Sequence, residues 1–133
     1  MKRLLIPIFL VIFCETANGL FFPGFHDCGI ASPIFPDKAV LPYSPVANQN
    51  ATFSVWVANE WSESVFLSRA VIGFGTDVQV IVEPNITLNR GDLHVIEAVV
   101  PLPESRPMPW TVNFDLEDAD RNEIGCVDVS IKI

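Results

Sequence analysis

The chain has 133 residues, of which half are apolar, sixteen are acidic and eight are basic. Its net charge of −8 excludes the strongly basic surface that nucleic-acid-binding proteins present, so we expect no nucleic-acid partner. The length is that of one ordinary domain and leaves no room for a second.

The start of the chain has the features of a cleavable secretory signal. The basic pair Lys2 and Arg3 precedes an unbroken apolar run over 4–14, and small residues lead up to Gly19. A run of this length is shorter than the roughly twenty residues that span a bilayer, so a membrane anchor is the less favoured alternative. We therefore expect a signal peptide over 1–19, with cleavage after Gly19.

The remaining domain, residues 20–133, keeps two cysteines, Cys28 near its start and Cys126 near its end. An exported chain folds in an oxidising compartment, so we expect these cysteines to form a disulfide; two unpaired buried thiols are the alternative. The domain also keeps six basic and fifteen acidic residues, a net charge of about −9, which favours solubility. We expect a secreted, extracellular protein, with the lumen of endosomes or lysosomes as a further location.

Short alternating segments separated by turn residues make up this domain, which is typical of an all-β sandwich or barrel. In the segment 77–83, Val78, Val80 and Val82 share one face. Prolines between 101 and 109 then interrupt strand pairing, because proline has no amide hydrogen to donate. Alternation predicts the first strands over 51–58, 65–74 with a bend or bulge at the glycine pair Gly73 and Gly75, 77–83 and 93–100.

A hairpin is the last predicted element. Trp110, Val112, Phe114 and Leu116 alternate with polar residues over 110–117. The polar run 118–122 supplies the turn, and 127–133 supplies the return strand. Two antiparallel sheets packed as a sandwich are the economical assembly of these strands.

Few groups could carry catalysis or hold a metal. His26 and His94 are the two histidines, and neither accompanies a nucleophile motif, so we expect no enzyme and no cofactor. Asp118 and Asp120 match the start of a calcium loop, but Glu123 stands where that loop needs glycine. We therefore expect a solvated hairpin turn and no metal site.

Two glycosylation sequons begin at Asn50 and Asn85, and both abut predicted strand ends. In a secreted chain they predict surface glycans; chance occurrence without modification is the alternative. Ten phenylalanines and three tryptophans also exceed what a thin sandwich needs. A dense core would account for them. The alternative is that the two sheets splay and their facing side chains line a dry cavity that takes a lipid.

Several stretches resemble the ML lipid-recognition domain family. The sequence FHDCG over 25–29 resembles the family's opening motif. The closest likeness is to the epididymal secretory sterol carriers of the Niemann-Pick type C branch. The family's central strand pair has counterparts in residues 68–73 and 78–82. Its closing hairpin has counterparts in residues 111–118 and 126–131.

The resemblance implies an immunoglobulin-like, two-sheet antiparallel β-sandwich with an apolar cavity between its sheets. Such a protein holds a single lipid (a sterol, phospholipid or fatty acid) for transport or presentation, as a monomer with transient membrane contact. A secreted interaction or innate-immune recognition module with a solid core is the alternative. Carried over by position, the lipid-binding residues are Val82 and Leu102, with Val78, Val80, Trp110 and Phe114 as inward neighbours.

This chain departs from the sterol carriers at several positions. It has no cysteines for two further small-loop disulfides. Val82 and Arg106 stand where the family has aromatic residues at the pocket mouth. The identity of the lipid therefore does not follow from the resemblance.

Overall fold

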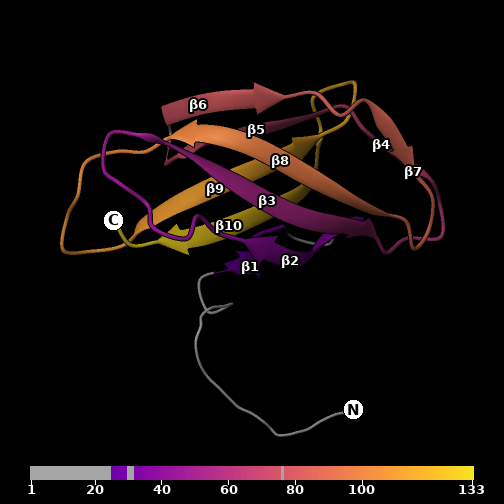
Figure 1. Cartoon of the computed structure of the whole chain (residues 1–133). Coiled ribbons are helices and arrows are strands. Elements are labelled where there is room, and N and C mark those ends of the chain that lie inside the picture. Colours follow the sequence, from indigo (N-terminus) through magenta and orange to yellow (C-terminus); the bar gives the residue numbers. More distant parts are fainter. Residues whose placement is uncertain (1–24, 30–31, 76) are drawn as a thin grey trace, which may run out of the picture.

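The computed structural model describes residues 25–29, 32–75 and 77–133, which form ten β-strands (Figure 1). The expected signal peptide lies outside these residues. Among them, there is no helix of the length and apolarity that a membrane crossing requires. The strands are β1 (Phe25–Asp27), β2 (Ile34–Val40), β3 (Asn50–Asn59), β4 (Val65–Leu67), β5 (Arg69–Phe74), β6 (Asp77–Val82), β7 (Ile86–Leu88), β8 (Leu93–Pro101), β9 (Trp110–Glu117) and β10 (Glu123–Ile131).

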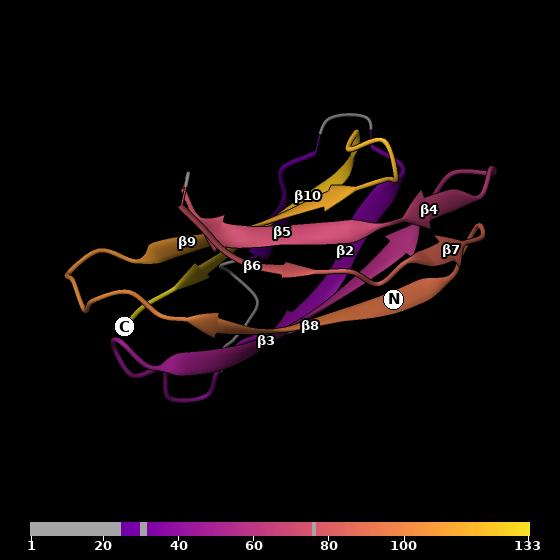
Figure 2. The ribbon, with the colours of Figure 1, turned by 90° about the horizontal axis from the view of Figure 1, so that it is seen from above.

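The strands form two main antiparallel sheets. One sheet has the order β1-β10-β9-β5-β6, and the other has the order β2-β3-β8. Strands β4 and β7 pair separately as a short ribbon. Figure 2 shows β6 running between β5, its partner in the larger sheet, and β8 of the smaller sheet. The predicted all-β, two-sheet sandwich is therefore confirmed.

The predicted strands agree with the structure except at two places. Strands β3, β6, β8 and β9 lie where alternation placed them, whereas β10 begins at Glu123 and not at the expected Val127, and ends at Ile131. The expected strand 65–74 is divided at Ser68 into β4 and β5. The amide of Ser68 donates to the carbonyl of Glu117 in β9 and so continues the pairing of β5 with β9, whereas β4 pairs with β7. The bend at Gly73 is confirmed by a shift in register, and a Cβ at that position would lie 2.0 Å from the carbonyl oxygen of Asp77.

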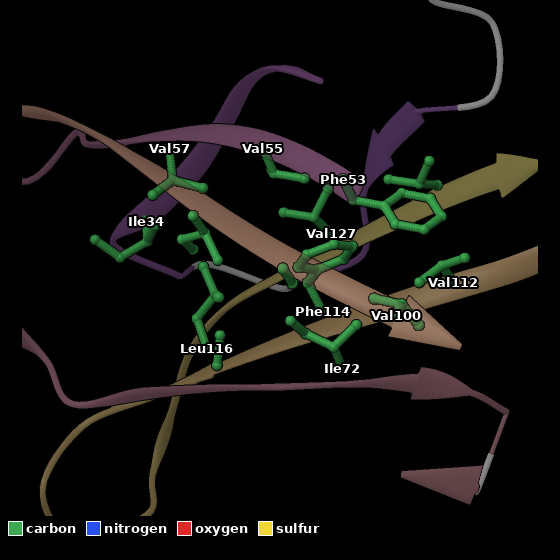
Figure 3. Close-up of a cluster of buried hydrophobic side chains, with 14 of the residues drawn as sticks. Ile34, Phe53, Val55, Val57, Ile72, Val100, Val112, Phe114, Leu116 and Val127 are labelled. Carbon is green, nitrogen blue, oxygen red and sulfur yellow. The ribbon is translucent and has the colours of Figure 1, made fainter. Parts of the chain in front are cut away.

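The inward faces of both sheets supply the core, as Figure 3 shows. At its centre, the rings of Phe53 from β3 and Phe114 from β9 meet edge to face, with centroids 6.4 Å apart. Burying side chains of this size contributes about 1.5–3 kcal/mol each. Fully buried core residues include Ile34, Val55, Val57, Ile72, Val100, Val112, Leu116 and Val127.

The predicted disulfide joins Cys28 and Cys126, which are 98 residues apart in sequence, and their Cα atoms lie 4.9 Å apart. The amide of Cys28 also donates to the carbonyl of Cys126, which continues the pairing of β1 with β10. Beside the bridge, the Asn113 side-chain amide donates to the Asp128 carboxylate over 2.7 Å. The bridge therefore fixes the short first strand to the last one.

Candidate functional site

Three of the predicted lipid-binding residues lie on β6. Val80 and Val82 are half-buried and pack against the core. Val78 differs from its expected inward position, because its side chain is 58% exposed. It lies near the start of β6, an edge strand, beyond the shift in register at Gly73. Ile72 pairs with Val80, whereas its neighbour Gly73 pairs with Val78, so the register shift places Val78 on the opposite face from Val80. Alternation in the sequence does not show such a bulge.

The other three predicted residues are packed into the body of the sandwich. Phe114 is at the centre of the core, and Leu102 is only 5% exposed. The Trp110 ring packs edge to face against Phe74 at a centroid distance of 5.7 Å, and its indole N–H donates to the carbonyl of Glu104. The Arg106 guanidinium lies 3.6 Å over the same ring. These side chains hold the end of the sandwich together, and their contact with a lipid stays a prediction.

A hollow of about 180 Å³ lies between β6 and β8. These strands are the last strands of two different sheets, so the hollow lies where the edges of the sheets meet. One of its lining residues, Ile96, is only 2% exposed and belongs to the core, so the hollow borders the apolar interior. The lining consists of Val82, Glu83, Pro84, His94, Val95, Ile96 and Glu97.

Of the six predicted residues, Val82 is the one that lines this hollow. Sequence reasoning missed its polar members, Glu83, His94 and Glu97. The inward alternation of His94 on β8 was a usable signal, but nothing in the sequence indicates that β6 and β8 face each other. The volume is below the roughly 300–1,000 Å³ of typical ligand pockets. The hollow therefore has room for a polar head group or the end of a chain.

Two larger hollows lie on the surface. One, of about 430 Å³, is lined by three carboxylates (Asp27, Asp37 and Glu60) together with Phe35, Pro36 and Ala58. The other, of about 380 Å³, includes Trp61, Phe66 and the hairpin turn around Asp118. Neither is lined by a residue from β6 or β8, so neither lies where the two edge strands meet. We therefore take the hollow between β6 and β8 as the candidate site.

The outer face of the larger sheet carries a group of carboxylates. Burial, followed by the nearby charges of Glu117 and Asp128, raises the pKa of Asp115. Burial, followed by the charges of Asp115 and Glu117, raises the pKa of Glu123. Arg69 pairs with Glu117 over 2.6 Å, and the His26 imidazole lies 3.4 Å from Asp128. At neutral pH the folded state therefore holds crowded, partly buried negative charge.

We expect the variant D115N/E123Q to have a higher free energy of unfolding than the parent at pH 7.5. A carboxyl group whose pKa is raised by folding destabilises the folded state above that pKa, and the penalty is relieved as protons bind at lower pH. The advantage of the variant should therefore shrink towards pH 4.5. Urea denaturation of both proteins across this pH range measures the difference between their free energies of unfolding. An advantage that does not change with pH would contradict the assignment.

No family model matches this chain, and no curated protein matches its sequence. Among solved structures, a Niemann-Pick type C2 protein from Japanese carpenter ant matches with a TM-score of 0.51 and 13% identity, over 80% of this chain and 96% of that one. Chicken MD-1, solved in complex with lipid IVa, matches with a TM-score of 0.30 and 12% identity, over 81% of this chain and 96% of that one.

The ant protein carries the structural argument, since the TM-score of the other match is too low to support one. At 13% identity the likeness shows the fold and not the activity. The sheet order and the disulfide of this chain are observations independent of that comparison. The chain thus has an immunoglobulin-like, two-sheet antiparallel β-sandwich fold similar to that of a Niemann-Pick type C2 protein.

Proposed function

We propose that this protein binds a single lipid between its two sheets, with the hollow between β6 and β8 as the mouth of the site. The observation that carries the proposal is that this hollow, at the junction of two sheet edges, reaches a core residue, Ile96. The fold shared with a Niemann-Pick type C2 protein and the sequence resemblance to ML lipid-recognition domains both support it. The lipid is a sterol, a phospholipid or a fatty acid, held for transport or presentation.

The sheet topology gives the lipid a route into the interior. Because β6 and β8 belong to different sheets, no ladder of backbone hydrogen bonds joins them. They can therefore move apart at the cost of side-chain contacts alone. An apolar chain that enters between them gains about 25 cal/mol for each Å² it removes from water, so affinity needs no charged anchor. The protein then acts as a carrier, without a catalytic step.

We expect V82D to weaken binding of an uncharged sterol at least tenfold, which is about 1.4 kcal/mol. The change places an unpaired charge on the wall of the mouth, where it is desolvated when the lipid enters. The matched control is I81D, because Ile81 directly precedes Val82 in β6 and is exposed on the other face of that strand. Titration with a fluorescent sterol measures both variants. Equal binding by folded V82D and the parent would remove this hollow from the proposed site.

The proposal includes secretion and glycosylation. Asn50 and Asn85, the first residues of the two sequons, are both exposed, which is compatible with glycan attachment. We expect the secreted protein to begin at Leu20 and to lose mass on treatment with an N-glycosidase.

A specific observation favours a second candidate function, recognition of a partner protein. The outer face of the smaller sheet carries exposed apolar side chains from β2 and β8, namely Phe35, Val40, Leu93 and Val99. Exposed apolar groups of this kind are typical of interaction surfaces. If the purified protein carries no lipid and binds none, this second function takes precedence.

A further inference from the structure

The glycosylation sequon at Asn50 lies on the outer face of the smaller sheet. Asn50 is the first residue of β3, and its side chain is exposed. Phe53 of the same strand is fully buried and faces the core, so alternation turns Thr52 and, two residues earlier, Asn50 outward. The register of β3 with β8 is continuous along this stretch, which keeps the assignment. A glycan on Asn50 therefore starts on the outer face of this sheet.

Exposed apolar side chains lie beside this attachment point. On the outer face, Val99 of β8 pairs with Thr52, and Val40 of β2 pairs with Ser54. Val40 is 53% exposed and Val99 is 55% exposed. Because a strand rises about 3.4 Å per residue, Thr52 lies about 7 Å and Ser54 about 14 Å from Asn50 along β3. Both valines thus lie next to the space that the first sugars of the glycan occupy.

The neighbouring strands leave this end of the sheet open. The pairing of β2 with β3 ends at Val40, so Asn50 has, among the described residues, a strand partner on the β8 side alone. Farther along the same face, Trp56 is already covered by Lys38, whose ammonium lies 4.6 Å from the ring centroid. The apolar surface next to the attachment point is therefore that of Val40 and Val99.

We propose that a glycan on Asn50 packs over Val40 and Val99 and shields this end of the smaller sheet. This inference rests on the glycosylation included in the proposed function, and it gives that glycan a position and a role. Sugar rings bring C–H groups to the apolar side chains and hydroxyl groups to the solvent, so they remove apolar area from water and keep the surface polar. The shield leaves Phe35 and Leu93, at the opposite end of this face, for a protein partner.

Footprinting of the full-length secreted protein with a small, water-soluble diazirine tests the shield, with the labels mapped by mass spectrometry of peptides. The internal reference is Leu93, which lies at the far end of the same face and is 58% exposed. In the parent, Val40 and Val99 should be labelled less than Leu93. In N50Q, we expect their labelling to rise at least about twofold while that of Leu93 stays unchanged.

Two control variants assign the effect to the glycan on Asn50. N85Q removes the other sequon, which lies between β6 and β7, and should leave the labelling of both valines unchanged. T52S keeps the sequon at Asn50 and should behave as the parent does. Enzymatic removal of glycans from the folded parent gives the same comparison as N50Q without a mutation.

Sedimentation velocity supplies a second readout of the shield. The uncovered apolar surface of N50Q should cause self-association as the protein concentration rises. In N50Q/V40T/V99T that surface is made polar, so this variant should sediment as the parent does.

Peptide mapping of the parent separates the possible failures. An unmodified Asn50 overturns this inference together with glycosylation at that residue. A modified Asn50 whose glycan can be removed without raising the labelling of Val40 and Val99 overturns this inference alone. Lipid binding is a separate measurement, and N50Q should bind the fluorescent sterol as the parent does, because Asn50 does not line the hollow between β6 and β8.

Discussion

Replacing Leu102 with aspartate is expected to unfold the domain and not merely to weaken lipid binding. Leu102 is 5% exposed and belongs to the core, and its amide donates to the carbonyl of Gln49 in the neighbouring loop. The substitution leaves a cavity and buries a carboxylate without a partner, which together cost about 4 kcal/mol or more. Domains of this size are stable by about 5–15 kcal/mol in total.

Urea denaturation, monitored by tryptophan fluorescence and near-ultraviolet circular dichroism, measures this effect. The matched control is M108D, because Met108 lies in the same connection between β8 and β9 and is 68% exposed. We expect M108D to stay within about 0.5 kcal/mol of the parent. A cooperative L102D variant of parental stability would show that Leu102 faces a solvated space, as at the rim of an open pocket.

Removing the disulfide through C28S/C126S should lower the free energy of unfolding by about 2–5 kcal/mol. The bridge closes a loop of 98 residues, and in the folded state it secures β1, a strand of three residues at the edge of its sheet. Local loss of β1 should therefore precede global unfolding in the variant, and hydrogen exchange at residues 26–28 should speed up.

Reductant provides the control for this prediction. It should lower the stability of the parent towards that of C28S/C126S and leave the variant unchanged. A parent protein whose stability does not respond to reductant at all would contradict the bridge as a determinant of stability.

The sequence was most informative where a strand has one buried face and one exposed face. Phe53, Val55 and Val57 in β3, like Val112, Phe114 and Leu116 in β9, alternate with less buried residues as expected. Strand β2 was missed because Pro36, Asp37 and a shift in register interrupt its pattern, which an edge strand tolerates. The division at Ser68 was missed because β4 and β5 pair in different sheets, which a continuous apolar run does not indicate.

The candidate site was less predictable than the fold. Val82 was reached through the family resemblance, and it does line the hollow. Glu83 and Glu97 were not identified, because their proximity arises from the meeting of two sheet edges and not from any sequence pattern. The expected burial of Val78 was wrong because the register shift between β5 and β6 turns it to the other face, and no sequence pattern indicates that shift.

Photolabelling tests the central claim, lipid binding between the sheets, most directly. A long-chain alcohol with a diazirine at mid-chain is equilibrated with the secreted protein, irradiated, and mapped by mass spectrometry of the intact chain and its peptides. We predict one label for each chain, on residues around Val82 in β6, around Ile96 in β8, or on inward side chains such as Phe114. Labels confined to the outward residues of β2 and β8, such as Phe35 and Val99, or no saturable labelling, would contradict it.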